Sequence, residues 1–196
     1  MSEYADLRVE LGEVTVITID RPTRRGALSV QTVREFERAL DEAESVAARA
    51  IVLTGTGEGF CAGADLQMVA AAGTPVPFLT ELYPLLLRLR RLEPLLVVAI
   101  NGMAVGAGLE LLLAADIAVA SPSAKAKDGH LELSAIGGTV GPPRALPPAY
   151  AKYLVLTGVT MQATDLLERG LVAEIVEPAE LLGRARMLAL AAIGQS

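Results

Sequence analysis

The chain has 196 residues, which allows one substantial hydrophobic core but not two domains of equal size. Its net charge of -6 excludes a protein whose main task is to bind nucleic acid, because that task needs a net basic surface. Hydrophobic residues make up 52% of the sequence and aromatic residues only 4%, so Ala, Val, Leu and Ile must fill the core. This composition is typical of an α/β protein.

Nothing in the sequence indicates export or a membrane. The single cysteine, Cys61, has no partner for an internal disulfide, which is typical of a reducing compartment. Residues 1–6 are acidic and lack the basic and apolar layout of a signal peptide, and every apolar stretch is interrupted before it could span a bilayer. We therefore expect a cytoplasmic protein with no membrane partner.

Strands and helices alternate in the first quarter of the chain. The β-branched run at 14–20 predicts a strand that ends at a proline. Residues 29–48 predict a helix, because apolar side chains recur at helical spacing and Ser29 can cap its first turn. The short apolar run at 50–54 predicts a buried parallel strand, and a glycine-rich turn and loop follow it.

The alternation continues along the chain. Residues 78–92 predict a helix interrupted only by Pro84, and the apolar run at 95–100 predicts a strand buried on both faces. A glycine- and alanine-rich helix is expected at 106–115 and a further strand at 117–120. Such a series predicts parallel βαβ units within one domain that covers residues 1–196.

The pattern is weaker in the last third of the chain. Residues 137–148 are rich in glycine and proline, helical character returns near Tyr150, and the last helix is expected at 179–193. We find no fixed-period repeat in the sequence.

Two glycine-rich segments follow buried strands at the expected starts of helices. They read GFCAGAD at 59–65 and NGMAVGAGLE at 101–110. In open parallel sheets, ligands bind at the carboxyl ends of strands, where helix N-termini offer unpaired N–H groups and small residues allow close approach. Two such amides aimed at one carbonyl oxygen form an oxyanion hole, which an acyl thioester needs to stabilise its enolate. The alternative is that each segment is only a close contact between a helix and a strand.

Taken together, these segments closely resemble the crotonase superfamily, the enoyl-CoA hydratase/isomerase family. The resemblance runs from about Val9 to the end of the chain and also includes DRP at 20–22, ALS at 27–29, AADIAVA at 114–120, LTG at 156–158 and GLV at 170–172. It implies an α/β fold built as a spiral of repeated ββα units with surrounding helices. It also implies an acyl-CoA thioester as the substrate, no metal, and no cofactor besides the CoA that is part of the substrate.

The resemblance implies an oxyanion hole formed by the backbone amides of Ala62 and Ala107. The positions that it implies for substrate binding are Arg24, Ala27, Ala64, Asp65, Leu66 and Gly106. For Asp65, a role as a helix cap is an open alternative. For Arg24, which would contact the CoA phosphates, the alternative is an ordinary surface arginine.

Glu110 matches the first of the two catalytic glutamates of hydratases. Its spacing supports that role independently, because it lies three residues after Ala107 and therefore one turn along the same helix face. A lone carboxylate within an otherwise apolar helix favours a function over an idle surface position. A structural carboxylate is the alternative.

The position of the second catalytic glutamate is occupied by His130, the only histidine of the chain. An imidazole near a carboxylate can serve as a general acid or base near pH 7. In an extended segment, Asp128, His130 and Glu132 would point to one side, so any of them could transfer a proton, or the second acid could be absent. An ordinary half-exposed histidine is the remaining interpretation.

The leading hypothesis is therefore a lyase of fatty acid metabolism that adds water to a 2-enoyl-CoA. The alternatives are isomerase, thioester hydrolase or decarboxylase chemistry, or an acyl-CoA-binding protein without catalysis. The resemblance further implies a homo-oligomer, a trimer or a hexamer. The C-terminal helices that usually follow in the family are largely absent, so the apolar face of the last helix is expected to need a cover from a neighbouring subunit. That face includes Leu181, Leu182, Ala185, Leu188 and Ala192.

Overall fold

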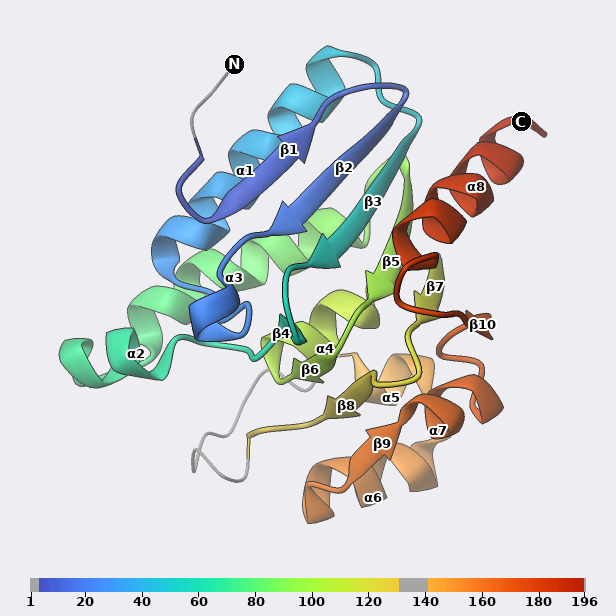
Figure 1. Ribbon diagram of the computed structural model, residues 1–196. Coiled ribbons are helices and arrows are strands. Elements are labelled where there is room, and N and C mark those ends of the chain that lie inside the picture. The colour runs from blue at the N-terminus through green and yellow to red at the C-terminus, as the bar shows by residue number, and fades with distance from the viewer. Residues whose placement is uncertain (1–3, 131–140, 196) are drawn as a thin grey trace.

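The computed structural model describes residues 4–130 and 141–195. Its largest element is a six-stranded sheet with the strand order β1-β2-β3-β5-β7-β10 (Figure 1). All neighbouring strands of this sheet are parallel except β1 and β2, which are antiparallel. The strands are β1 (Leu7–Glu10), β2 (Val14–Ile19), β3 (Ala50–Gly55), β5 (Leu95–Ile100), β7 (Ile117–Ala120) and β10 (Glu174–Ile175).

A smaller four-stranded sheet continues three strands of the large one. Its order is β4-β6-β8-β9, and its strands are β4 (Gly59–Cys61), β6 (Met103–Val105), β8 (Lys125–Lys127) and β9 (Thr160–Gln162). β3 leads into β4, β5 into β6 and β7 into β8, each through a short turn. Because a helix follows β4 and β6 directly, the chain contains successive ββα units.

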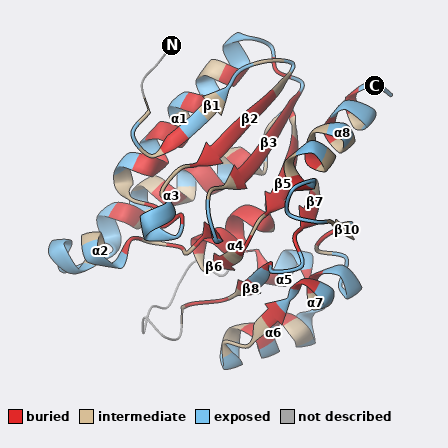
Figure 2. Cartoon of the chain, in the orientation of Figure 1, coloured by how far each residue is buried: buried red, intermediate tan, exposed pale blue. Residues whose placement is uncertain are grey.

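Helices cover both faces of the large sheet (Figure 1). On one face lie α1 (Val30–Ser45) and α3 (Val76–Leu89), whose buried side chains join the main hydrophobic core. α1 begins as predicted, with the Ser29 hydroxyl accepting a hydrogen bond from the backbone N–H of Thr32 at 3.1 Å. Figure 2 shows that the central strands of the large sheet, β2, β3, β5 and β7, are buried along almost their whole length.

The opposite face is covered by α8 (Leu181–Ile193), and this corrects one expectation. Leu181, Ala185, Ala189 and Ile193 are buried against side chains of β2, β3, β5 and β7. The sheet of the same chain therefore covers part of the face expected to need a neighbouring subunit: Leu181 and Ala185 are buried, while Leu182, Leu188 and Ala192 are half-buried. The physical reason is that the buried strands alternate, so every second side chain faces away from α1 and α3 and needs this helix.

The remaining helices are short. They are the 3-10 helix η1 (Pro22–Arg24), α2 (Leu66–Ala72), α4 (Ala107–Leu112), α5 (Pro142–Ala145), α6 (Pro148–Thr157) and α7 (Ala163–Glu168). α4 is shorter than the helix expected at 106–115, and α3 begins at Val76 and includes Pro84. Among the helices of residues 4–130 and 141–195, none combines the length and the apolar character needed to cross a membrane.

Candidate active site

Backbone packing brings the two glycine-rich segments together at the carboxyl ends of β3 and β5. A Cβ on Gly102 would lie 2.0 Å from the carbonyl oxygen of Glu58, and a Cβ on Gly108 would lie 2.1 Å from that of Cys61. Side chains at these two positions would overlap the neighbouring backbone. The glycines therefore allow α4 and β6 to pack directly against β4, and they place the start of α4 beside the segment that follows β4.

The backbone amide of Ala62 is already engaged. Its N–H donates to the carbonyl oxygen of Arg25 at 3.0 Å. The residue two positions later differs: Ala64 forms an isolated parallel bridge with Leu28, in which the hydrogen bonds belong to Gly63 and Asp65. Within the described parts of the chain, the N–H of Ala64 therefore has no acceptor.

Ala107 is the first residue of α4, and its N–H also has no acceptor among residues 4–130 and 141–195. The segment with Ala64 runs beside it, because a Cβ on Gly63 would lie 2.8 Å from the carbonyl oxygen of Val105 and 3.6 Å from the amide nitrogen of Ala107. The amides available as a pair are thus those of Ala64 and Ala107. The expected oxyanion hole of Ala62 and Ala107 stays a prediction, and the N–H of Ala62 would have to leave Arg25 to serve in it. Ala64, expected as a substrate-binding position, has the amide without an acceptor in the described chain.

Glu110 lies one turn along α4 and is buried, with 3% of its surface exposed. The backbone N–H of Gly141 donates to both carboxylate oxygens at 3.0 Å, and Nη2 of Arg90 lies 2.5 Å from Oε2. A Cβ on Gly141 would lie 2.8 Å from Oε2, so a glycine is needed for this approach. All three contacts come from hydrogen-bond donors, so the described partners hold the Glu110 side chain as an acceptor.

His130 is paired with Asp128. The Oδ1 atom of Asp128 lies 2.7 Å from Nδ1 of the imidazole and also accepts the backbone N–H of His130 at 3.0 Å. The hydrogen bond to Asp128 raises the pKa of His130 above its ordinary value; burial opposes this, and the charges of Asp128 and Glu110 add to it. Because Nδ1 is occupied, Nε2 is the ring nitrogen left for a substrate. The third candidate of this segment, Glu132, lies outside the described residues.

Asp65 is the N-cap of α2, which is one of the two roles that the sequence allowed for it. Its Oδ1 accepts the backbone N–H groups of Gln67 and Met68 at 3.1 and 3.3 Å, and its Oδ2 lies 3.1 Å from Nη2 of Arg21. Burial alone would raise the pKa of Asp65, but the hydrogen bonds from Met68 and Arg21 and the charge of Arg21 outweigh burial and lower it. These contacts account for Asp65 without a ligand.

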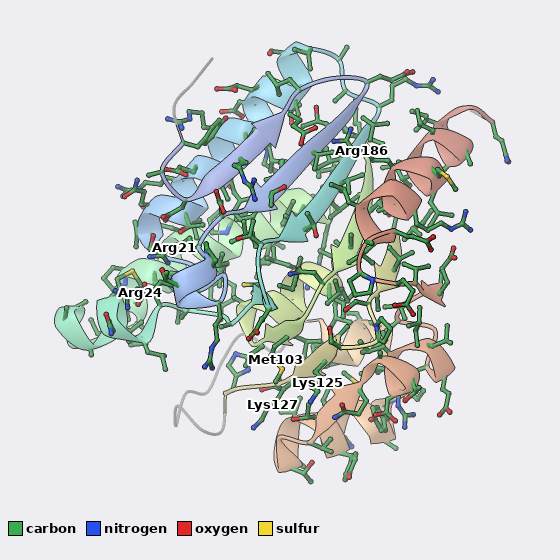
Figure 3. All side chains as sticks on the ribbon, viewed as in Figure 1. Arg21, Arg24, Met103, Lys125, Lys127 and Arg186 are labelled. Carbon is green, nitrogen blue, oxygen red and sulfur yellow. The ribbon has the colours of Figure 1, made fainter. Side chains whose placement is uncertain are left out.

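Three of the other expected substrate-binding residues surround this cap. The Arg24 side chain is exposed and donates to Oε1 of Gln67, Leu66 is 54% exposed at the start of α2, and Ala27 is buried with its carbonyl oxygen bonded to Arg21. Figure 3 shows Arg21 and Arg24 near one another beside α2. The remaining residue, Gly106, precedes Ala107 with a φ of 52°, which favours glycine, and its N–H is bonded to the carbonyl oxygen of Lys127.

Two residues of this region were missed by the sequence reasoning. Arg21 lies within the DRP motif, so its place in that motif was a usable signal. Arg90 lies in the run RLRR at 88–91, which has the charge pattern of an ordinary surface. Nothing in that run distinguishes Arg90 from its neighbours.

A cavity of about 1120 Å³ lies elsewhere, at the amino ends of the parallel strands. Its lining includes Ala48, Pro94 and Asp116, which precede β3, β5 and β7, and Ile193 at the end of α8. None of the candidate site residues lines it. In the described ranges, no three His, Cys, Asp or Glu side chains are grouped as a metal site would require.

Comparison with known proteins gives a consistent result. The sequence model described as enoyl-CoA hydratase/isomerase matches residues 10–195. The chain is 34% identical over 187 residues to a short-chain-enoyl-CoA hydratase of Clostridium acetobutylicum, covering 91% of this chain and 71% of that protein. It is also 34% identical over 188 residues to an (E)-benzylidenesuccinyl-CoA hydratase of Thauera aromatica, covering 90% and 71%.

The fold agrees with the sequence match. The crystal structure of an enoyl-CoA hydratase from Bacillus anthracis superimposes with a TM-score of 0.89 and 30% identity, covering 94% of this chain and 75% of that chain. This likeness confirms the predicted mixed α/β fold class. The chain therefore belongs to the enoyl-CoA hydratase/isomerase family, the crotonase superfamily.

Proposed function

We propose that the protein is an enoyl-CoA hydratase that adds water across the double bond of a 2-enoyl-CoA. The observation that carries this proposal is the environment of Glu110, a buried carboxylate held by donors one turn from the amide of Ala107, which has no acceptor among the described residues. Two relatives with hydratase names match nine-tenths of this chain, which supports the same reaction.

The thioester oxygen would be bound by the N–H groups of Ala64 and Ala107. Both amides lack an acceptor within the described chain, so they are free to bind a ligand without breaking a hydrogen bond of the fold. Such donors stabilise the negative oxygen that develops in the transition state, and losing one typically costs about 10²- to 10³-fold in kcat. The substrate bond polarised in this way is the conjugated Cα=Cβ bond.

Hydration then needs one base and one acid. Glu110 removes a proton from water, the water oxygen bonds to Cβ, and the electron pair of the double bond moves to the thioester oxygen to give an enolate. His130 donates its proton to Cα, which restores the carbonyl and completes the addition of H and OH. The proton on Glu110 returns to the imidazole through water, so both groups regain their starting states.

The CoA portion would lie across the start of α2. Arg24 is exposed there and has donors beyond the one used on Gln67, so it is suited to a phosphate group. Ala27, Leu66 and Gly106 would line the path of the substrate, while Asp65 would act indirectly by holding α2 in place. CoA is then part of the substrate and no separate cofactor is needed.

The proposal includes a homo-oligomer, a trimer or a hexamer, and a cytoplasmic location. Exposed apolar side chains on α6 support self-association, since Tyr153 is 49% and Leu156 is 70% exposed. The single buried cysteine supports a reducing compartment.

The test is turnover of crotonyl-CoA, followed by the loss of the enoyl thioester absorbance and identification of a 3-hydroxyacyl product. We expect turnover in the wild type, a large loss of kcat in Glu110→Gln and in His130→Ala, and no loss in Glu168→Gln, an exposed carboxylate on α7 used as a control. Tight binding of the thioester without turnover would indicate a binding protein. Conversion of a 3-enoyl-CoA to a 2-enoyl-CoA without hydration would indicate an isomerase.

A further inference from the structure

A charged side chain from α3 reaches the proposed base. Arg90 directly follows α3, its side chain is only 15% exposed, and its Nη2 lies 2.5 Å from Oε2 of Glu110. Tyr83, two turns earlier on α3, is also near: its pKa is raised by burial and then by the negative charge of Glu110. The end of α3 thus faces the part of α4 that carries Glu110.

The neighbouring arginines do not share this contact. Arg88 binds three carboxylates of α1, those of Glu37, Asp41 and Glu44. Arg91 is exposed and lines the cavity at the amino ends of the strands. Of the three arginines at 88–91, Arg90 is the one that is directed to the candidate active site.

The two carboxylate oxygens of Glu110 differ in the number of hydrogen-bond contacts that they accept. A carboxylate has about four lone-pair sites, and the described residues supply three contacts: Gly141 N–H on Oε1, Gly141 N–H on Oε2, and Arg90 on Oε2. Within residues 4–130 and 141–195, Oε2 therefore has both sites occupied, whereas Oε1 keeps one. A carboxylate buried without a counter-charge is strongly unfavourable, so Arg90 both compensates the charge and fixes which oxygen is open.

We infer that Arg90 is a positioning residue for the proposed hydration, which holds the Glu110 carboxylate by its Oε2 atom and turns Oε1 toward the attacking water. Arg90 itself does not touch the substrate. This inference rests on the proposed function, because it assigns Glu110 the role of base. It also predicts that Arg90 affects the chemical step and leaves binding of the CoA thioester intact, since the paired amides and Arg24 lie on other elements.

The experiment compares three variants with the wild type on crotonyl-CoA. Arg90→Met removes the charge and the donor while keeping a long side chain, Arg90→Lys keeps the charge, and Arg91→Met is the matched control. We expect Arg90→Met to lower kcat about 100-fold, as displacement of a reacting group does, with KM changed less than about threefold. The kcat of Arg90→Lys should be about tenfold higher than that of Arg90→Met. A single contact with one carboxylate oxygen depends more on the positive charge than on the planar guanidinium group. Arg91→Met should behave as the wild type.

Thermal unfolding of each variant separates positioning from loss of fold. A kcat for Arg90→Met equal to that of the wild type overturns the inference. Equal losses of kcat in Arg90→Met and Arg90→Lys also overturn it if they parallel a decrease in the melting temperatures of the two variants. If the wild type hydrates no crotonyl-CoA, the proposed function fails. In that case, urea unfolding of Arg90→Met, Glu110→Gln and the double variant tests the pairing of Arg90 with Glu110 separately. If the losses in free energy of unfolding of the two single variants add up in the double variant, the pairing is overturned. A double variant that is no less stable than Arg90→Met supports the pairing.

Discussion

Asp128 holds the only histidine of the chain through two contacts from one oxygen, 2.7 Å to Nδ1 of His130 and 3.0 Å to its backbone nitrogen. Asp128 is 2% exposed, so its charge is poorly screened by water. The pair fixes the orientation of the ring and leaves Nε2 as the ring nitrogen that does not contact Asp128. The sequence resemblance predicts a second catalytic group at His130, and that role stays a prediction.

The pKa of His130 predicts the direction of a pH effect. The hydrogen bond that the imidazole donates to Asp128 is the largest cause of the upward shift of the His130 pKa from the ordinary value of 6.5. If His130 is the acid, kcat falls as the pH rises through this raised pKa. The Asp128→Asn substitution removes the carboxylate that raises the pKa of His130. The alkaline limb of the plot of kcat against pH should therefore move to lower pH. Glu168→Gln is the control, and its pH profile should match that of the wild type. If the alkaline limb of Asp128→Asn stays at the wild-type pH, His130 is excluded as the acid.

The same shift has a consequence for stability. The folded-state pKa of His130 lies above its unfolded value of about 6.5, so the pairing stabilises the fold fully below that pH and ceases to do so as the pH rises through the folded-state pKa. The difference in free energy of unfolding between wild type and Asp128→Asn should therefore be larger at pH 5.5 than at pH 9. Urea unfolding at both pH values measures it, and a difference that grows toward pH 9 would contradict the sign.

A proline substitution tests the amide of Ala107. Proline has no N–H, and it is well tolerated at the first position of a helix, which Ala107 occupies in α4. We expect Ala107→Pro to lose about 10²- to 10³-fold in kcat, as removal of one oxyanion donor does. The melting temperature should change little because the removed N–H has no acceptor in the described chain. Full activity in a folded Ala107→Pro would show that this amide is not a donor to the thioester.

Much of the fold could be predicted because its signals are local. The strands β3, β5 and β7 are mainly apolar runs, β2 is a β-branched run, and the cap at Ser29 lies next to the helix that it starts. The strands of the small sheet have three residues each, which is too short for alternation to be visible. Their pairing depends on contacts between distant segments.

The details of the site depend on such distant contacts as well. Whether Ala62 or Ala64 has a free amide is decided by hydrogen bonds with Arg25 and Leu28, which no spacing within residues 59–65 reveals. The pairing of Arg90 with Glu110 similarly depends on how the end of α3 packs on α4. Family resemblance therefore predicts the region of the candidate site, while the hydrogen bonds that occupy individual amides there are visible only in the structure.

Gly108 and Gly183 form a matched pair for testing close backbone packing. Both lie in helices, but a Cβ on Gly108 would be 2.1 Å from the carbonyl oxygen of Cys61, whereas a Cβ on Gly183 would meet nothing within 4 Å. Gly108→Ala should lower the free energy of unfolding by about 3 kcal/mol or more, because backbone must move. Gly183→Ala should raise it by about 0.5–1 kcal/mol through helix propensity. Urea unfolding of both variants is the measurement, and equal effects would refute the packing.

Cys61 is predicted to be unreactive in the folded protein despite its place beside the candidate oxyanion hole. It is fully buried, and burial raises the pKa of its thiol to about 12, against a small opposing effect of a hydrogen bond from the backbone of Gly63. The thiolate is the reactive form, so almost none is available at neutral pH. A disulfide reagent such as 5,5'-dithiobis(2-nitrobenzoate) should modify Cys61 only at the rate of unfolding and rapidly in urea, and Cys61→Ala should keep turnover. Fast labelling of the native protein together with loss of activity in Cys61→Ala would instead assign this thiol a part in the chemistry.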